Sequence, residues 1–364
     1  IEINEIEKIS SIYLNSKNTV FTWGMGLTHH INGTDNIESI SNLALLRGMI
    51  GDEGKGLLPL RWHDNVENVG FMGISDELKS KILEVMEERY NLSLPNYQGM
   101  DTLTCIQAAA KREIDFALLL GGNLFSVNPD RNFSEKALSS IPFKVMINST
   151  LNQTNLNGIE GENIVLPFRV QDNERERGNS INSEIEIISD IATSVINKEV
   201  IDFSIFRKQK NIRLALSQLL PGFENIEDID TKKKQFHIGG NYLLKPEFNT
   251  DSGKAIFKIP NNTEWNPRNQ IGSFNLTSVR SEGQFNTMIY DEKDNHRNQT
   301  KRNVLYISSD DIKSLGLSSG DIVDVKSETG VMKDLILAEY NIKPGNVMTY
   351  MPEANILIPQ NADA

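Results

Sequence analysis

Helical and strand-like spacings of apolar residues follow one another in the first part of the chain. Apolar side chains recur every three or four positions between Ile3 and Tyr13, which predicts an amphipathic helix. Residues 19–23 form a β-branched and aromatic run that is typical of a strand. After a polar loop, a second helical pattern runs from Asp35 to about Met49. This segment is therefore expected to fold as helix, strand and helix.

The middle of the chain alternates between helical patterns and short apolar runs. The continuous apolar run 116–120 is typical of a buried strand in a parallel sheet. Asp101 is placed to cap a helix. Helical patterns occur at residues 76–90, 101–112, 131–140 and 183–197, and strand-like runs at 116–120, 144–148 and 164–166. This alternation favours an α/β fold with parallel, doubly wound sheet segments.

The spacing of apolar residues is irregular in two stretches of the chain, and it changes to a strand-like pattern near the C-terminus. Residues 52–75 are glycine-rich and predicted to be irregular, and residues 225–265 are predicted to be a polar connector with short strands. From Ser273 onward, apolar alternation and glycine-containing turns dominate, with strands expected at 322–327 and 347–350. Short strands at this spacing indicate a small β-barrel.

These patterns divide the chain into four expected segments. They are the end of one α/β dinucleotide-binding-like domain, a second α/β domain, a connector and a β-barrel, over residues 1–60, 61–200, 201–270 and 271–364. The first residues, Ile1 to Asn4, contain no initiator methionine and no apolar signal core. We therefore expect the chain to be part of a longer polypeptide.

Composition narrows the possible partners. The 364 residues carry a formal net charge of −12, which argues against broad binding to nucleic acid or to anionic membranes. No apolar run approaches the roughly 18 residues that a membrane span needs. The single cysteine, Cys105, excludes a disulfide framework and any cysteine-only zinc or iron–sulfur site within this chain, and it favours a cytoplasmic location. Because Cys105 lies on the apolar side of a predicted helix, we expect a buried, inert thiol.

Two glycine pairs follow predicted strands. Gly24 and Gly26 lie between a strand and a helix, where backbone N–H groups and the positive helix end suit a phosphate. Glycine also ends strands for steric reasons, and the third glycine of the dinucleotide fingerprint is missing, so a simple NAD-binding fold is not favoured. Gly121 and Gly122 form a second such site, but the residues alone favour a tight turn followed by an Asx-type helix cap.

Histidines and arginines give weaker signals. His29 and His30 are adjacent, so their side chains point in opposite directions on an extended segment and cannot easily share a metal ion. Arg61 and Arg280 lie in predicted loops, where each could clamp a phosphate or remain a surface charge. No cysteine–histidine cluster or catalytic triad is recognisable.

The order of the motifs resembles one known family. The run from Phe21 to Arg61 is similar to the MGxTxH…GTDN…NLALLxGMIG signature of formate dehydrogenase-like bis-molybdopterin-guanine-dinucleotide oxidoreductases, in the DMSO reductase superfamily. Similar motifs follow in the family's order, at residues 60–66, 121–130, 142–154, 236–240, 250–257, 274–287 and 344–355. The resemblance thus covers nearly the whole chain.

The resemblance implies a redox enzyme. Its cofactor would be bis-molybdopterin guanine dinucleotide with molybdenum or tungsten, and its reaction the two-electron oxidation of formate or a similar small substrate. Electrons would leave through an iron–sulfur cluster of the 4Fe-4S type, outside this chain, to an electron-acceptor protein. The metal ligand is expected upstream, in the N-terminal half of the protein, which would be the main partner of this chain. Residues 271–364 would form the molybdopterin-dinucleotide-binding barrel, of the six-stranded double-psi type and truncated here.

The motif match also transfers individual cofactor-binding residues. They are Gly24, Met25, Gly26, Thr28, His29, Arg61, Asn65, Gly121, Gly122, Asn123, Asp130, Thr277, Arg280, Gln284, Asn286, Thr287 and Asn355. Trp62 stands where the family has a glycine, which favours an alternative: a non-catalytic nucleotide-binding or interaction module that has lost the cofactor. Because half of a bis-pterin site holds its cofactor poorly, we expect these 364 residues alone to be apo and inactive.

Overall fold

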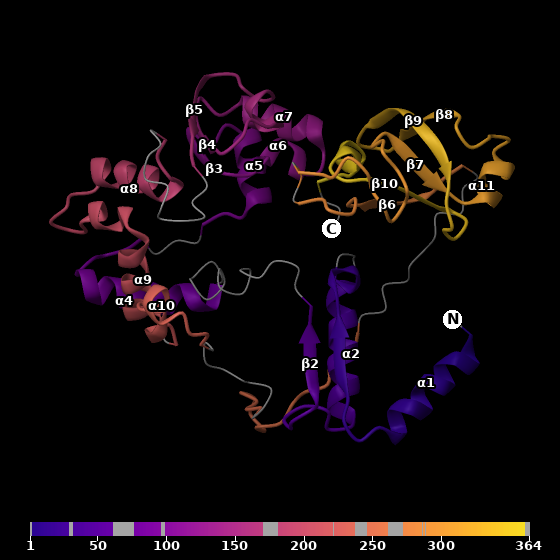
Figure 1. The fold of residues 1–364 in the computed structure, drawn as a ribbon, viewed down its shortest axis with the longest axis horizontal. Coiled ribbons are helices and arrows are strands. Elements are labelled where there is room, and N and C mark those ends of the chain that lie inside the picture. Colours follow the sequence, from indigo (N-terminus) through magenta and orange to yellow (C-terminus); the bar gives the residue numbers. More distant parts are fainter. Residues whose placement is uncertain are drawn as a thin grey trace.

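The computed structural model divides into helices and three separate β-sheets (Figure 1). It describes residues 2–28, 32–60, 76–95, 99–169, 181–220, 222–236, 246–260, 272–285, 287 and 289–360, with side chains in helix α4 described from residue 82. Parallel sheets flanked by helices precede a mixed C-terminal sheet, which confirms the predicted fold class.

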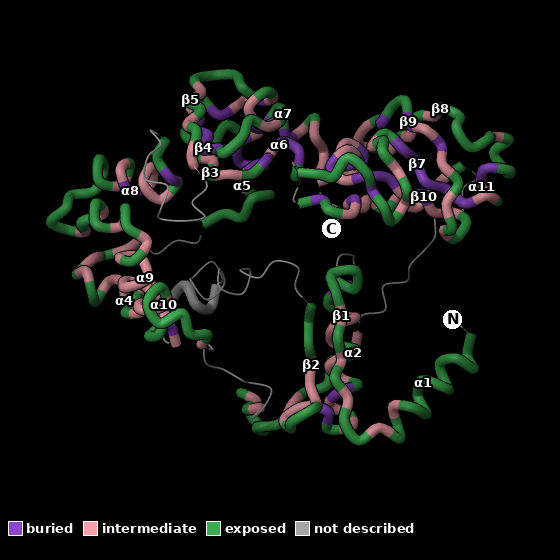
Figure 2. The backbone as a smooth tube through the Cα atoms, viewed as in Figure 1, coloured by how far each residue is buried: buried purple, intermediate pink, exposed green. Residues whose placement is uncertain are grey.

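The N-terminal part is a helix followed by a small parallel sheet. Its elements are α1 (Ile3–Asn15), β1 (Val20–Trp23), the 3-10 turn η1 (Met25–Leu27), α2 (Gly33–Leu46) and β2 (Gly56–Pro59). The prediction of irregular structure over residues 52–75 was wrong for β2, which pairs in parallel with β1. The strand is only four residues long, too short for a period-2 pattern to stand out. Helix α1 is exposed along nearly its whole length (Figure 2).

A second parallel sheet forms the centre of the chain. Its elements are α4 (Asp76–Tyr90), α5 (Thr102–Ala110), β3 (Phe116–Leu120), α6 (Leu124–Val127), α7 (Arg131–Ser139), β4 (Phe143–Asn148), η3 (Gln153–Asn155) and β5 (Glu162–Pro167). The strands lie in the order β3-β4-β5, all parallel. Buried Ile106, Phe125 and Leu138 join α5, α6 and α7 in one core. The predicted cap is confirmed, because Asp101 accepts a hydrogen bond from the Thr104 N–H at 2.8 Å.

Strand β3 differs from its prediction. Its continuous apolar sequence predicts burial on both faces, yet Phe116 is 51% exposed, Leu118 38% and Leu120 51%. Within the described part of the chain, β3 lies at the edge of the sheet, paired with β4 on one side. The three exposed residues alternate along the strand and therefore lie on one face of the sheet. The described residues leave this face of β3 largely uncovered.

Helices follow the central sheet. They are α8 (Glu184–Val195), η4 (Phe203–Arg207), α9 (Gln209–Leu219), η5 (Glu224–Ile226) and α10 (Ile229–Lys232). The prediction of short strands within residues 225–265 was wrong for the described parts of that stretch, 225–236 and 246–260, which contain no strand. No described helix is long and apolar enough to cross a membrane.

The C-terminal part is a mixed sheet. Its elements are β6 (Asn275–Val279), β7 (Val304–Ile307), α11 (Ser309–Ser314), β8 (Ile322–Lys326), β9 (Val331–Glu339), β10 (Asn346–Tyr350) and η6 (Glu353–Leu357). The order is β6-β10-β7-β9-β8, in which β6–β10 and β7–β9 are parallel pairs and the other two are antiparallel. The described residues thus supply five strands. Leu305, Leu335 and Val347 lie in its apolar core.

Candidate functional site

The first predicted site is a tight turn between β1 and α2. The Thr28 N–H and hydroxyl both donate to the Met25 carbonyl, each at 2.9 Å. Helix α2 then begins at Gly33, where an added Cβ would lie 2.3 Å from the Thr28 carbonyl oxygen. Only glycine permits so close an approach. The chain therefore turns back on itself after Gly24 and Gly26 as the motif requires, while His29 lies outside the described residues.

The second predicted site follows β3 and has an open backbone. Gly121 and Gly122 have φ of +61° and +85°, which favours glycine, and no atom lies within 4 Å of an added Cβ at either position. The Gly121 N–H donates to the Ile147 carbonyl of β4 at 2.8 Å, which holds the turn against the sheet. A ligand can therefore approach this main chain without meeting a side chain.

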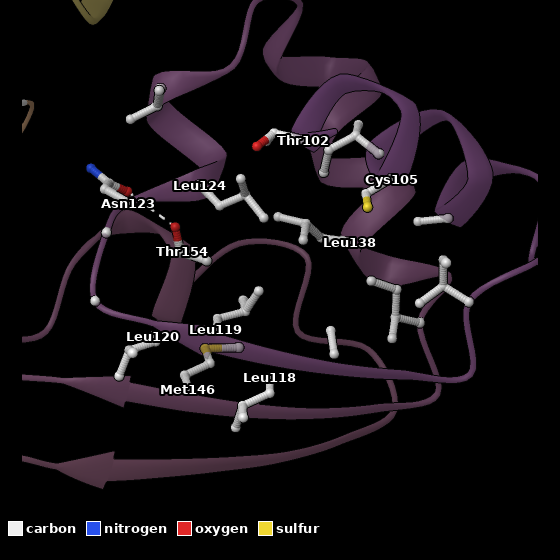
Figure 3. Close-up of a pocket in the computed structure, with 18 of the residues that line it drawn as sticks. Thr102, Cys105, Leu118, Leu119, Leu120, Asn123, Leu124, Leu138, Met146 and Thr154 are labelled. Carbon is white, nitrogen blue, oxygen red and sulfur yellow. Dashed lines mark hydrogen bonds between the residues drawn. The ribbon is translucent and has the colours of Figure 1, made fainter. Parts of the chain in front are cut away.

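Asn123 supports that turn from inside. It is 4% exposed, and its side-chain oxygen accepts a hydrogen bond from the Thr154 hydroxyl at 3.1 Å (Figure 3). The same hydroxyl accepts one from the Phe125 N–H at 3.0 Å, near the start of α6. Asn123 thus fixes the strand-to-helix connection from within the fold.

Asp130 and Asn355 meet where the central unit contacts the C-terminal sheet. The Asp130 carboxylate caps α7 by accepting from the Phe133 N–H at 3.1 Å, as the Asx-cap interpretation predicts. The Asp130 N–H donates to the carbonyls of Asn355 and Ile358, at 3.0 and 2.8 Å. In return the Asn355 amide donates to the carbonyls of Ser126 and Val127, at 2.7 and 2.8 Å. The last four of these hydrogen bonds hold η6 against α6 and α7, and both donor hydrogens of the Asn355 amide are used inside the protein.

Gln284 has a similar internal role beside β6. Its side-chain oxygen accepts from the Ser281 N–H at 3.0 Å, and its amide donates to the Met351 carbonyl at 3.0 Å. The residue is 6% exposed. It therefore joins the loop after β6 to the end of β10.

Thr287 is buried and differs from these residues in one respect. It is 2% exposed, and its hydroxyl oxygen has no hydrogen-bond partner. Buried hydroxyls are normally paired, so an unpaired one suits a partner from outside the described residues. Its carbonyl accepts from the Tyr290 hydroxyl at 2.7 Å, which fixes the backbone there. Thr277 is exposed on β6 and Arg280 is half-buried.

Arg302, which sequence reasoning missed, organises the same region. Its guanidinium forms a forked ion pair with Glu353 of η6, at 2.5 and 2.9 Å, and donates to the Met351 carbonyl at 2.6 Å. It also donates to the Ser281 hydroxyl at 3.1 Å and lies 4.1 Å above the Tyr290 ring. One side chain therefore joins the loop after β6 to η6. The only hint of this role in the sequence is that Arg302 forms a basic pair with Lys301 just before β7.

A second arginine, Arg131, contacts the same region around η6 from the central unit. Arg131, the residue after Asp130, donates to the Pro352 carbonyl at 2.7 Å, while its Nε atom is buried without a partner. Burial lowers the pKa of the Arg131 guanidinium, and the nearby Glu353 carboxylate acts in the opposite direction. Its place directly after the GGNLFSVNPD motif is the sequence signal that could have identified it.

Asp294 holds the loop after β6 to the end of β10. Its carboxylate accepts from Arg297 at 2.6 Å and from the Tyr350 hydroxyl at 2.8 Å, and it is 3% exposed. Burial acts to raise the pKa of this carboxyl, but hydrogen bonds from Arg297 and Tyr350 outweigh burial and hold the pKa below its usual value. Burial also raises the pKa of Tyr350. The aspartate is therefore an ionised structural anchor at neutral pH.

Four of the predicted cofactor-binding residues lie outside the described residues, and the prediction that the Cys105 thiol is buried was wrong. Arg61, Asn65 and Asn286 lie outside the described residues, as His29 does. The Cys105 thiol is only half-buried, and lines a cavity beside β3, because α5 is not covered on that side. Within the described residues, no group of three His, Cys, Asp or Glu side chains is placed to hold a metal ion.

Comparison with known proteins identifies the chain. The family model "Molybdopterin oxidoreductase" matches residues 2–167, and "Molydopterin dinucleotide binding domain" matches residues 274–364. The chain belongs to the molybdopterin oxidoreductase family. The second model covers the C-terminal sheet with Thr287 and Arg302, and the first covers both glycine turns.

Two curated relatives agree with this assignment, and one solved structure is also similar. An uncharacterized oxidoreductase of Mycobacterium tuberculosis is 29% identical over 398 residues, covering 99% of this chain and 51% of the relative. The F420-dependent formate dehydrogenase subunit alpha of Methanocaldococcus jannaschii is 25% identical, covering 94% of this chain and 54% of the relative. Acetylene hydratase from Pelobacter acetylenicus matches 75% of this chain and 42% of its own, at a TM-score of 0.48 and 18% identity. The chain thus spans about half the length of the curated relatives it matches.

The described residues fit a molybdopterin dinucleotide in two places. Gly121 and Gly122 leave main chain open to a ligand, and the Thr287 hydroxyl lacks a hydrogen-bond partner among the described residues. Asn123, Gln284 and Asn355, by contrast, use their side chains to hold the surrounding walls. Both kinds of residue are needed for a preorganised site.

Proposed function

We propose that this chain is part of a formate dehydrogenase-like oxidoreductase that uses bis-molybdopterin guanine dinucleotide with molybdenum or tungsten. When bound, the cofactor would supply the two-electron redox chemistry on formate or a similar small substrate. Electrons would pass to an iron–sulfur cluster outside these 364 residues and then to an acceptor protein. The metal ligand and that cluster would belong to polypeptide beyond this chain, in the cytoplasm.

The residues of this chain would bind and orient the dinucleotide. The main chain at Gly121 and Gly122 suits the close approach of phosphate or ribose oxygens, because no atom lies within 4 Å of an added Cβ at either position. The single observation that carries the proposal is the buried, unpartnered hydroxyl of Thr287, at a position that the family motif assigns to the cofactor. Arg302 and Asn355 would keep the loop after β6 and η6 in place around it.

Replacing Thr287 with valine tests this assignment. Valine has the same shape without the hydroxyl, so the free energy of unfolding should change by less than about 0.5 kcal/mol, since no protein hydrogen bond is lost. The amount of guanine dinucleotide that co-purifies with the longer polypeptide should fall, because the hydroxyl would have bonded the cofactor. Denaturant unfolding and nucleotide released by acid measure the two effects.

Thr349 provides the matched control. It is equally buried, but its hydroxyl donates to the Val304 carbonyl at 2.7 Å. Thr349→Val should cost about 1 kcal/mol of stability and leave the dinucleotide content of the folded fraction unchanged. A Thr287→Val variant that is destabilised but keeps its full dinucleotide content would contradict the proposed role.

The alternative function is a non-catalytic nucleotide-binding or interaction module. It is favoured by Trp62, which stands where the family motif has glycine beside the expected cofactor. Such a module would contain neither molybdenum nor tungsten after expression with both metals supplied.

A further inference from the structure

Asn152, which the motif match does not transfer as a cofactor-binding residue, holds the second glycine turn. Its side-chain amide donates to the Gly122 carbonyl at 2.9 Å. The turn is also held from the sheet, because the Gly121 N–H donates to the Ile147 carbonyl of β4 at 2.8 Å. The two glycines are thus fixed on one side by β4 and on the other by a side chain from the loop after β4.

The hydrogen bond from Asn152 sets the direction of one backbone N–H group. The peptide bond between Gly122 and Asn123 is trans and planar, so its C=O and N–H groups point in opposite directions. Because the carbonyl points toward Asn152, the Asn123 N–H points away from it. Rotation of this peptide would turn the N–H elsewhere and would break the hydrogen bond to Asn152.

The Asn123 N–H has no hydrogen-bond acceptor among the described residues. Asn123 is only 4% exposed, and buried backbone N–H groups are nearly always paired. The neighbouring main chain is open to close approach, since no atom lies within 4 Å of an added Cβ at Gly121 or Gly122. An acceptor oxygen from outside the described residues therefore suits this N–H.

Asn152 is itself held in place by the turn η3. Its side-chain oxygen accepts from the Thr154 N–H at 2.9 Å, and its own N–H donates to the Asn155 side-chain oxygen at 2.9 Å. The same Asn155 oxygen accepts from the amide of Asn148, which is 6% exposed at the end of β4, at 3.2 Å. Hydrogen bonds therefore run from the sheet through Asn155 and Asn152 to the Gly122 carbonyl.

We propose that Asn152 is a positioning residue for the dinucleotide: it holds the peptide between Gly122 and Asn123 so that the Asn123 N–H is aimed at a phosphate or ribose oxygen. This inference rests on the proposed function, because the dinucleotide is the ligand that this N–H would meet. A donor that is oriented before binding does not have to be turned when the ligand arrives, so less free energy is lost on binding. Asn152 acts through the backbone and does not itself contact the dinucleotide.

Two substitutions remove the donor and keep the cap of η3. In Asn152→Ser and Asn152→Asp, a side-chain oxygen can still accept from the Thr154 N–H. The serine hydroxyl is too short to reach the Gly122 carbonyl, and an ionised carboxylate has no hydrogen to donate. Asn152→Asp adds a negative charge that repels a phosphate, whereas Asn152→Ser adds none. The pair therefore separates the loss of the donor from the effect of charge.

The test measures the release of guanine dinucleotide from the longer polypeptide. Each variant is warmed below its unfolding transition, and GMP is measured in the filtrate after acid hydrolysis. Loss of one oriented hydrogen bond should make the release about five to ten times faster in both variants. Asn157→Ser is the matched control, since the Asn157 amide donates to the Gln153 carbonyl at 2.7 Å beside the same turn. This control should release the dinucleotide as slowly as the parent.

Amide exchange at Phe125, measured before release, distinguishes positioning from a general loosening of the loop. The Phe125 N–H donates to the Thr154 hydroxyl at 3.0 Å, so its exchange reports whether the loop after β4 keeps its place. Positioning predicts faster release of the dinucleotide with unchanged exchange at Phe125 and unchanged denaturant unfolding. Faster release together with faster exchange at Phe125 would show that Asn152 only stabilises the loop, and would overturn the proposal.

The outcomes also separate this inference from the proposed function. If the parent contains the dinucleotide and releases it as fast as both Asn152 variants do, the positioning role is wrong while the proposed function stands. Faster release from Asn152→Asp alone would assign the effect to the added charge and would also overturn the positioning role. A longer polypeptide without guanine dinucleotide would overturn the proposed function, and the positioning role with it.

Discussion

Arg302→Met is expected to lower the stability of the C-terminal sheet by about 2–3 kcal/mol. The substitution leaves the Glu353 carboxylate without its forked partner and removes the donor to the Met351 carbonyl. Breaking a buried ion pair costs about 3–5 kcal/mol, and this pair is about a quarter exposed, which reduces the cost. Amide exchange of β7 under increasing denaturant measures the effect.

Arg207→Met is the matched control for this prediction. Arg207 pairs with Asp190 and Glu186, but its side chain is 38% exposed and lies between η4 and α8. Exposed pairs contribute about 0–1 kcal/mol, so this variant should be nearly as stable as the parent. Arg302→Lys keeps the charge without the fork and should recover only part of the loss. Equal, small losses for Arg302→Met and Arg207→Met would show that Arg302 does not organise the sheet.

Asn355→Ala is expected to weaken the contact between η6 and the central unit by about 2 kcal/mol. The carbonyls of Ser126 and Val127 would lose their donor at a buried position, where an unpaired polar group is costly. The Asp130 N–H, which donates to η6, should then exchange faster with solvent. Hydrogen exchange at Asp130, compared with exchange within β4, measures the loosening.

Asn346→Ala is the matched control for Asn355→Ala, because Asn346 also donates hydrogen bonds to two backbone carbonyls. Asn346 donates to the carbonyls of Lys343 and Pro344, at 2.9 and 3.2 Å, within its own exposed turn. This variant should leave exchange at Asp130 unchanged. If Asn355→Ala also leaves it unchanged, the Asn355 amide does not hold the two parts together.

Much of the fold follows from local sequence patterns. The helical spacing from Ile3 to Tyr13 and the Asp101 cap were predicted correctly because periodicity and capping act within a few residues. Strand β2 was missed because four residues show no clear period. The exposure of β3 could not be predicted, since burial depends on which elements pack on each face of the sheet, and the local pattern does not report this.

The site was predicted less completely than the fold. Motif order predicts Gly121, Gly122 and Thr287 as cofactor-binding residues, and the open backbone of the glycines and the Thr287 hydroxyl, unpaired among the described residues, suit a ligand. It could not tell that Asn355 donates to carbonyls over 200 residues away in sequence, because a motif does not record where a side chain points. Arg302 was missed for the same reason: its role arises from three segments that meet only in the folded chain.

The ratio of guanine nucleotide to metal is the most direct test of the central claim. The longer polypeptide would be purified after growth with molybdate and tungstate, its metal measured by mass spectrometry, and its GMP measured after acid hydrolysis. A cofactor with two dinucleotide arms predicts about two GMP per molybdenum or tungsten atom. Folded protein that contains neither the metal nor the nucleotide would contradict the account and support a module that has lost its cofactor.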